Sequence, residues 1–226
     1  MAKNKQIIEF YGVQASGKTT LAIRLDEELK KSGVNSCLIT GELEEYKKSV
    51  FKLFKLIILN NFKFFKLWLY LYKINPRIYK SAKRALLFLA LKDIISREND
   101  YETIILEEGI LFYIYTYIQY SNNKNEIKRD AIKKLIDYLY NDYYKKFIIK
   151  IDVSGEKSVK RALNRNKNDN VFDDLEADNM CKLIESSWEF YDLIYDYCKC
   201  NKKIKLNGEE EIEKNISKIK CEIEGL

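Results

Sequence analysis

The stretch Gly12-Val13-Gln14-Ala15-Ser16-Gly17-Lys18-Thr19-Thr20 matches the pattern G-x-x-x-x-G-K-[ST]. An apolar segment, residues 6–11, precedes it, and a segment with helical periodicity follows it to residue 31. The glycines let the backbone curl so that successive N–H groups face one anion, and the start of the following helix adds partial positive charge. The sequence therefore predicts a phosphate-binding loop between a strand and a helix.

Two residues of this loop have side chains suited to bind charged ligands. We expect Lys18 to contact the bound phosphates with a full positive charge and Thr19 to offer its hydroxyl to a magnesium ion. The other residues expected to surround the phosphates are Gly12, Gln14, Ala15, Ser16, Gly17 and Thr20. The loop thus predicts which part of the protein holds phosphate and metal.

The composition bounds the class of protein. A chain of 226 residues with 46% hydrophobic residues can bury the core of one α/β domain, expected over residues 1–226. The excess of 40 Lys and Arg over 34 Asp and Glu suits an anionic ligand but is too small for a dedicated nucleic-acid binder, so no nucleic-acid partner is expected. The absence of histidine excludes Ser-His-Asp and Cys-His nucleophiles and histidine-ligated zinc.

The cysteines and the N-terminus indicate the compartment. The five cysteines are odd in number and lack paired C-x-x-C spacing, which fits neither a disulfide framework nor a four-cysteine zinc site. Residues 1–5 lead into the first strand without the apolar stretch of a signal peptide. We therefore expect a cytoplasmic protein with reduced thiols.

Apolar segments alternate with helical segments along the chain. Strands are predicted at 6–11, 34–40, 101–107, 146–153 and 203–207. This alternation predicts an α/β fold with a five-stranded parallel sheet covered on both faces. The connection over residues 43–100 is unusually long and helical except at Asn75-Pro76, where proline should divide it into two helical pieces. We expect this insertion to cover the acceptor site at the carboxyl edge of the sheet.

Within the insertion, residues 50–72 are strongly apolar and aromatic. The lysines at 52, 55, 63, 66 and 73 fall within one stripe at 100° per residue, which indicates one amphipathic helix. So many lysines argue against a membrane span. The broad apolar face could pack on the domain, or the helix could lie on an anionic membrane surface. We favour packing on the domain.

Charged residues follow two of the predicted strands. Glu107 and Glu108 end the third strand at the edge of the sheet where the phosphate loop also lies, so we expect Glu107 to help hold magnesium. Arg161 and Arg165 lie one helical turn apart after the fourth strand, in a region 154–175 that could close as a lid over the phosphates. The alternatives are a solvated strand end and a solvated basic helix face.

The chain resembles P-loop kinases of the nucleoside monophosphate kinase group, and thymidylate kinase most closely. The resemblance rests on the phosphate loop, on Arg84 to Lys92 before the third strand, on Ile151 to Arg165, on Trp188 to Tyr191, and on Ile204 to Ile216. It implies a three-layer P-loop NTPase fold with a helical acceptor-covering insertion and an arginine-bearing lid. It also implies ATP with Mg²⁺ as cofactors and is compatible with a homodimer.

The sequence departs from this family on the acceptor side. Thr40-Gly41-Glu42-Leu43-Glu44 replaces the family's Arg-Glu-Pro-Gly run, and Glu107-Glu108-Gly109 replaces Asp-Arg-Tyr. Lys92 replaces a further arginine, and with Arg84 it is a candidate acceptor-binding cation. An acceptor phosphate needs cations, whereas a hydroxyl acceptor benefits from a carboxylate that takes its proton. Glu42 and Glu108 are the candidate bases.

Two classes of function remain. We place first a magnesium-dependent kinase that moves the γ-phosphate of ATP to a small acceptor, with nucleoside monophosphates slightly ahead of a nucleoside, sugar or lipid-linked alcohol. The second class is a nucleotide-binding switch or accessory protein that acts on a partner or membrane through residues 50–72. The tyrosine-rich run 112–120 could stack on an acceptor base or sugar, although core packing is favoured.

Overall fold

The computed structural model describes residues 6–40, 50–98, 100–119, 129–140, 145–164 and 177–224. The side chains of residues 50–54, 119 and 224 are not part of this description. Two predicted site residues, Glu42 and Arg165, lie outside the described residues, as do residues 165–175 of the predicted lid region 154–175.

A parallel sheet of five strands forms the centre of the molecule. The strands are β1 (Gln6–Gly12), β2 (Ser36–Ile39), β3 (Thr103–Leu106), β4 (Lys145–Asp152) and β5 (Lys202–Asn207). Their order across the sheet is β2-β3-β1-β4-β5, and every pairing is parallel. The predicted strands and the predicted α/β class are therefore confirmed. Because β1 is central, the phosphate loop that follows it lies at the middle of the carboxyl edge.

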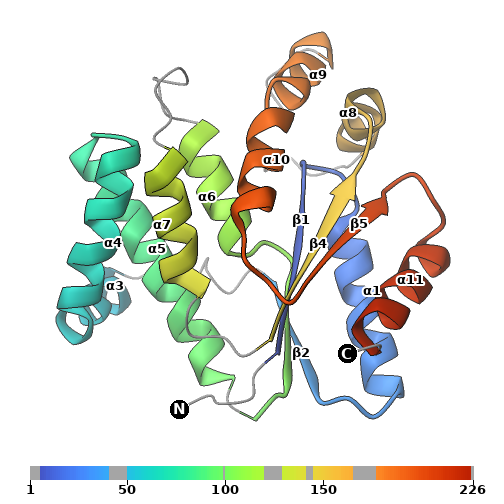
Figure 1. The fold of residues 1–226 in the computed structure, drawn as a ribbon, viewed down its shortest axis with the longest axis horizontal. Coiled ribbons are helices and arrows are strands. Elements are labelled where there is room, and N and C mark those ends of the chain that lie inside the picture. The colour runs from blue at the N-terminus through green and yellow to red at the C-terminus, as the bar shows by residue number, and fades with distance from the viewer. Residues whose placement is uncertain are drawn as a thin grey trace.

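Helices cover both faces of the sheet (Figure 1). Ile8 and Phe10 of β1 join one core with α1 (Lys18–Lys31) and α11 (Ile212–Glu224). Ile7 and Tyr11, which alternate with them, join the larger core on the other face. The helices that line it include α5 (Ile78–Arg97), α6 (Ile110–Gln119), α7 (Arg129–Tyr140), α9 (Ala177–Glu185) and α10 (Trp188–Tyr197). The result is the three-layer arrangement that the sequence predicted.

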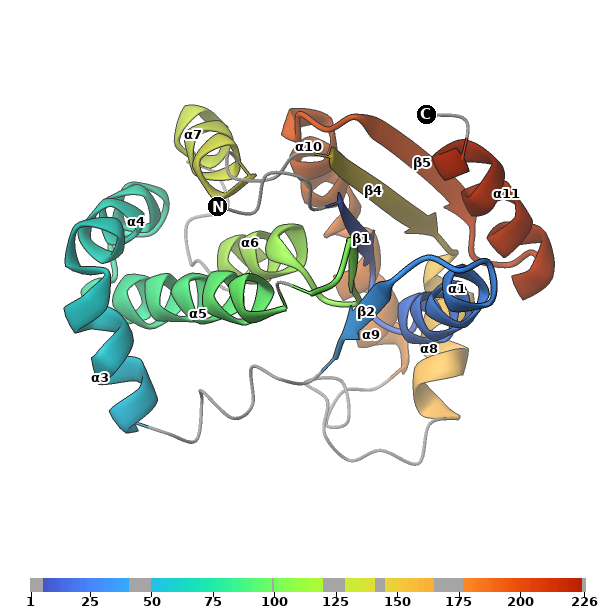
Figure 2. The ribbon, with the colours of Figure 1, turned by 90° about the horizontal axis from the view of Figure 1, so that it is seen from below.

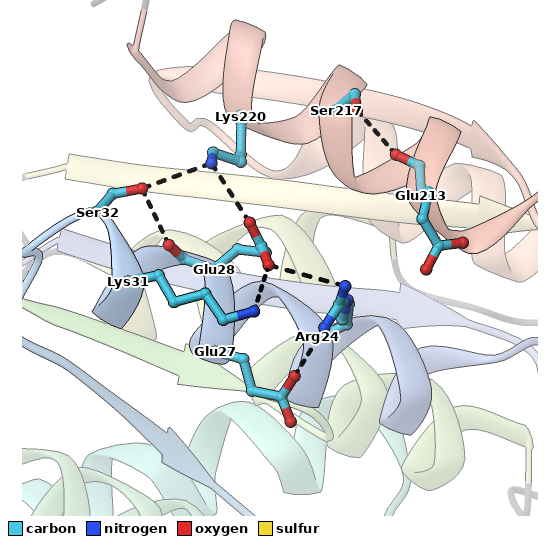
Figure 3. A network of polar contacts seen from close by, with 8 residues as sticks. All are labelled: Arg24, Glu27, Glu28, Lys31, Ser32, Glu213, Ser217 and Lys220. Atoms are coloured by element: carbon cyan, nitrogen blue, oxygen red, sulfur yellow. Dashed lines mark hydrogen bonds and ion pairs between the residues drawn. The ribbon is translucent and has the colours of Figure 1, made fainter.

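Polar contacts link α1 to α11 on the solvent side (Figure 3). Lys220 Nζ of α11 lies 3.7 Å from Glu28 Oε2 of α1 and 3.5 Å from Ser32 Oγ. Glu28 also pairs with Arg24 and Lys31 of its own helix. The hydrogen bond from Lys31 lowers the pKa of Glu28. Exposed pairs of this kind contribute little to the free energy of unfolding, so the apolar core beneath them holds the two helices in place.

Within residues 50–98, the long insertion forms α3 (Val50–Leu59), α4 (Asn61–Ile74) and α5. The break predicted at Pro76 is confirmed, since α4 ends at Ile74 and α5 begins at Ile78. The prediction of only two helical pieces is wrong, because the helix also breaks at Asn60, whose φ of −130° and ψ of 33° are not helical. Asparagine competes for nearby backbone groups, and the Asn60 side chain donates to the carbonyl of Leu56 at 3.3 Å. The lysine stripe predicted over residues 50–72 is therefore divided between two helices.

The predicted packing of this segment is confirmed for only one of its faces. Leu67, Leu71 and Ile74 of α4 are buried in the core that also holds α5 and α7. Other large apolar side chains of the segment stay exposed: Ile58, Leu59, Phe62, Phe65, Leu69 and Tyr72. Among the described residues, no helix is both long and apolar enough to cross a bilayer.

Candidate phosphate-transfer site

The phosphate loop, residues 12–19, has the backbone conformation that an anion cradle needs. Gly17 has φ of 102° and Ala15 has φ of 58°, so two residues in the loop adopt the left-handed region. Gly12 lies so close to β4 that a Cβ there would lie 2.8 Å from the carbonyl oxygen of Ile151. The glycine is therefore required by the close approach of the loop to the neighbouring strand.

Two polar side chains of the loop fit a bound phosphate. Lys18 is buried, and its Nζ donates to the carbonyls of Gly12 at 3.0 Å and Val13 at 2.8 Å, 5.5 Å from the ring of Phe112. Ser16 Oγ is buried and has no hydrogen-bond partner among the described residues. Buried hydroxyls are normally hydrogen-bonded, and a phosphate oxygen would satisfy this one. Gln14, by contrast, is partly exposed, and Thr20 in the first turn of α1 is exposed.

The structure brings together the two predicted magnesium ligands. Thr19 Oγ1 at the start of α1 donates a hydrogen bond to Glu107 Oε1, just beyond the end of β3. The two residues are separated by 88 positions in the sequence. A hydroxyl and a carboxylate oxygen are ligands that Mg²⁺ prefers, usually together with water and phosphate oxygens. The residues present therefore fit a magnesium ion beside the phosphate loop.

Helix α8 (Gly155–Leu163) contacts both the phosphate loop and the turn after β5. Ser158 Oγ donates to the carbonyl of Gln14 at 2.5 Å. The guanidinium of Arg161 donates to the carbonyls of Ser16 at 3.3 Å and Gly208 at 2.8 Å. Arg161, predicted to close over the phosphates, thus lies at the loop and bridges it to the turn after β5. Its role in catalysis stays a prediction.

The buried carboxyl group of Glu9 contacts helices next to the site. It lies in the middle of β1, and its Oε1 accepts from the backbone N–H of Leu111 at 2.7 Å while Oε2 accepts from the hydroxyl of Tyr140. Gly109 packs directly on it, since a Cβ at this glycine would lie 2.3 Å from Glu9 Cδ. Glu9 therefore holds the start of α6, and with it the Glu107-Glu108-Gly109 turn. Sequence reasoning missed this residue, although a carboxylate inside a fully buried strand was a signal.

Burial raises the pKa of Glu9 to about 7, while hydrogen bonds from Tyr140 and the backbone of Leu111 oppose the rise. The native state then binds a proton more tightly than the unfolded chain, so the free energy of unfolding should fall as the pH rises from about 4.5 to about 7. Between pH 5 and pH 8 we expect the free energy of unfolding of Glu9→Gln to rise by about 2–3 kcal/mol relative to that of wild type. The amide does not titrate, its oxygen can still accept from the N–H of Leu111, and its NH2 group can donate to the hydroxyl oxygen of Tyr140. Urea unfolding of both proteins at the two pH values measures this difference. The exposed Glu27→Gln is the control, and an equal gain there would contradict the assignment.

A pocket of about 480 Å³ opens beside the phosphate loop, on the side of β4 and β5. Gly12 and Val13 form one wall, and Trp188, Tyr191 and Asp192 of α10 form another. The remaining wall consists of the ends of β4 and β5 and the turn after β5. The pocket therefore lies across β1 from Glu107, which follows β3. A volume of this size suits part of a small molecule.

The pocket contains a set of charged groups that sequence reasoning missed. Lys150 Nζ pairs with Asp152 Oδ1 at 2.8 Å and Asp192 Oδ1 at 2.5 Å. A lysine among the isoleucines of β4, followed two residues later by an aspartate, was the available signal. The lysine side chain is largely buried, so the two carboxylates compensate its charge.

The predicted acceptor-side residues occupy different places. Glu108 is exposed next to Glu107 at the edge of the sheet. Arg84 lies between Tyr113 and Tyr117 of α6, with its guanidinium carbon 5.7 and 5.8 Å from the two ring centroids. Lys92 Nζ lies 5.3 Å from the ring centroid of Tyr138 on α7. The two candidate cations are thus half-buried against aromatic rings.

The tyrosine-rich run shows the favoured alternative, core packing. Tyr115 is buried and stacks on Tyr191 with ring centroids 3.8 Å apart. Tyr117 is buried too, and its hydroxyl donates to the carbonyl of Leu71 at 3.0 Å. Tyr120, the last residue of the run, lies outside the described residues.

Comparison with known proteins finds no match among protein families or curated proteins. Solved structures do match. A deoxyadenosine kinase from M. mycoides, with products dCMP and a flexible dCDP bound, is 17% identical with a TM-score of 0.55, and the match covers 98% of this chain and 100% of that chain. The same kinase with bound dATP is 16% identical with a TM-score of 0.55, covering 97% of this chain and 100% of that chain. Shikimate kinase from Bacteroides thetaiotaomicron is 13% identical with a TM-score of 0.55, covering 97% and 98%.

The chain has the fold of the P-loop kinases. At these identities the likeness shows the fold alone. None of the three structures is a thymidylate kinase, so the narrower resemblance stays a prediction.

Proposed function

We propose that this protein is a magnesium-dependent kinase that transfers the γ-phosphoryl group of ATP to a hydroxyl of a small acceptor, most specifically a nucleoside. The observation that carries the proposal is the contact of Thr19 with Glu107 beside the phosphate loop. It joins a predicted phosphate site to a pair of oxygen ligands for magnesium. Deoxyadenosine and shikimate, named in the similar kinases, carry hydroxyl groups and no phosphate. This supports the hydroxyl acceptor over the nucleoside monophosphate that the sequence placed slightly ahead.

In the proposed reaction the acceptor hydroxyl attacks the γ-phosphorus of ATP. A new bond forms between the acceptor oxygen and phosphorus, the bond to the β,γ-bridging oxygen breaks, and ADP leaves. Glu108, exposed beside Glu107, would take the proton of the hydroxyl. Lys18 would leave the carbonyls of Gly12 and Val13 to hold the phosphates. Magnesium, when bound by Thr19 and Glu107, would neutralise charge on the phosphates.

The pocket of about 480 Å³ supports the assignment of the donor side. It begins at Gly12 and Val13, so a nucleotide whose phosphates lie in the loop could extend into it. Glu107 and Glu108 lie across β1 on the opposite side of the loop. Donor and acceptor would therefore approach the γ-phosphate from the two sides of β1.

A panel of acceptors with ATP and Mg²⁺ tests the proposal. We expect the wild-type protein to phosphorylate one or more of deoxyadenosine, deoxycytidine, another nucleoside or shikimate, and to leave nucleoside monophosphates unchanged, as measured by chromatography of the products. Activity of a parallel preparation that lacks this protein is subtracted as contamination. Transfer to a nucleoside monophosphate, with no product from any alcohol, would contradict the hydroxyl acceptor. It would support the nucleoside monophosphate that the sequence placed slightly ahead. Nucleotide binding with no transfer to any acceptor would instead favour a nucleotide-binding switch.

A further inference from the structure

Helix α4 carries an exposed apolar stripe that the core does not cover. It consists of Phe62, Phe65, Leu69 and Tyr72, whose exposed fractions are 77%, 56%, 49% and 36%. At 100° per residue these four side chains fall within about 80° of the helix circumference. Large apolar side chains exposed singly are normal in proteins, but a continuous helical stripe of them marks a contact surface. We call these four residues the α4 stripe.

The α4 stripe is held rigidly at the outer edge of the molecule. The opposite face of α4, with Leu67 and Leu71, is fully buried in the core shared with α5 and α7. Tyr117 of α6 fixes the end of the helix by donating to the carbonyls of Leu71 at 3.0 Å and Asn75 at 3.3 Å. In both views α3 and α4 lie at the edge farthest from α11 (Figures 1 and 2). The stripe is therefore presented outward and away from the phosphate loop.

The segment that carries the α4 stripe is positively charged. Between Val50 and Lys92 the sequence holds eight lysines and two arginines, and no aspartate or glutamate. On α4, Lys63 and Lys73 follow the stripe along one side, and both are exposed. Lys66 lies on the same side, but its Nζ is turned to the ring of Tyr138 at 4.6 Å from the centroid. Lys55 at α3 is exposed as well.

Aromatic side chains extend the stripe along its other side. Trp68 is half-buried between Phe65 and Tyr72, with ring centroids 6.4 Å and 5.7 Å away. Tyrosine favours the boundary between lipid and water, where its ring is buried and its hydroxyl stays in water, and the exposed Tyr72 suits this boundary. A helix with phenylalanine and leucine on one face and lysines beside it has the pattern of an interfacial helix.

We propose that the α4 stripe docks on an anionic phospholipid surface, with α4 lying in the plane of the interface. Charge complementarity selects this occupant. A second copy of the chain meeting the same face would bring lysines against lysines with no carboxylate of the 50–92 segment to pair them. A bilayer containing acidic lipids receives the apolar side chains and attracts the lysines together.

Vesicle co-sedimentation of the full chain tests this proposal. At about 0.1 M salt we expect wild type to bind vesicles of phosphatidylcholine with about one third phosphatidylglycerol, and to bind phosphatidylcholine alone at least about tenfold more weakly. Each lysine near an acidic surface contributes a factor of about five, so Lys63→Glu with Lys73→Glu should weaken binding at least about tenfold. Phe62→Ser with Phe65→Ser should do the same through lost apolar burial.

Matched controls separate docking from general attraction of a basic protein. Lys214→Glu with Lys218→Glu makes the same charge change on α11 at the opposite edge, and Ile23→Ser with Ile212→Ser removes exposed apolar residues there. Both should keep wild-type binding. No binding by wild type, or equal losses in the α4 and α11 variants, would overturn the proposal. A wild-type dimer by sedimentation velocity that Phe62→Ser with Phe65→Ser converts to monomer would also overturn it, because the stripe would then belong to a second copy.

Discussion

Lys18→Ala is expected to lower kcat/KM for phosphate transfer by about 10³-fold. The ammonium group is the one full positive charge within the phosphate loop, residues 12–19, and it lies buried where the loop carbonyls of Gly12 and Val13 hold it. A charge preorganised in a site from which water is excluded stabilises the negative charge of the transferring phosphate strongly. Steady-state kinetics with the acceptor found in the panel, together with ATP binding by calorimetry, measures the loss.

Lys30→Ala is the matched control for this variant. Lys30 lies on the same helix, α1, but its ammonium is exposed and pairs with Asp26 at 2.6 Å. It should keep wild-type kinetics. If Lys18→Ala retained more than about one tenth of wild-type kcat/KM while remaining folded, the phosphate loop would not carry the chemistry.

Glu107→Gln is expected to lower kcat/KM by about 10²-fold at low magnesium and to raise the Mg²⁺ concentration needed for half-maximal activity. Glutamine can still accept the hydrogen bond from Thr19, so the fold around the loop is retained. It lacks the negative charge that attracts a divalent cation, and this charge is what a magnesium ligand supplies. A magnesium titration of the initial rate at fixed ATP measures the shift.

The control is Glu102→Gln, an exposed carboxylate before β3 at the opposite edge of the sheet. It should leave the magnesium requirement unchanged. An unchanged magnesium requirement in Glu107→Gln would show that the Thr19–Glu107 contact is structural and would remove the main support for the proposed function.

The parts of the fold that the sequence predicted are those set by local periodicity. Short segments rich in β-branched residues, such as 103–106, favour buried strands, and the glycine-lysine pattern predicts the loop after β1. The contact of Thr19 with Glu107 followed from topology, because the ends of neighbouring parallel strands share one edge. The first strand, the conformation of the loop after it and the contact of Thr19 with Glu107 were therefore accessible without a structure.

Other features depend on contacts between distant residues. Glu9 acquires its role from Tyr140 and Leu111, more than a hundred positions away, and its own strand gives only the hint of a misplaced charge. The break at Asn60 depends on one residue whose helix-ending effect competes with the apolar residues on both sides. The exposed half of α4 was missed because periodicity shows that a face is apolar but not whether another element covers it.

The central place of β1 has a consequence for how such a protein can change. In our proposal, the segments that contact the acceptor follow β2 and β3 in the chain. The segments that contact the nucleotide follow β4 and β5. The residues that would select the acceptor and those that would bind the nucleotide therefore lie on opposite sides of β1. A chimaera that exchanged residues 43–100 and Glu108 but kept Glu107 would present a new acceptor to the same proposed phosphate donor site.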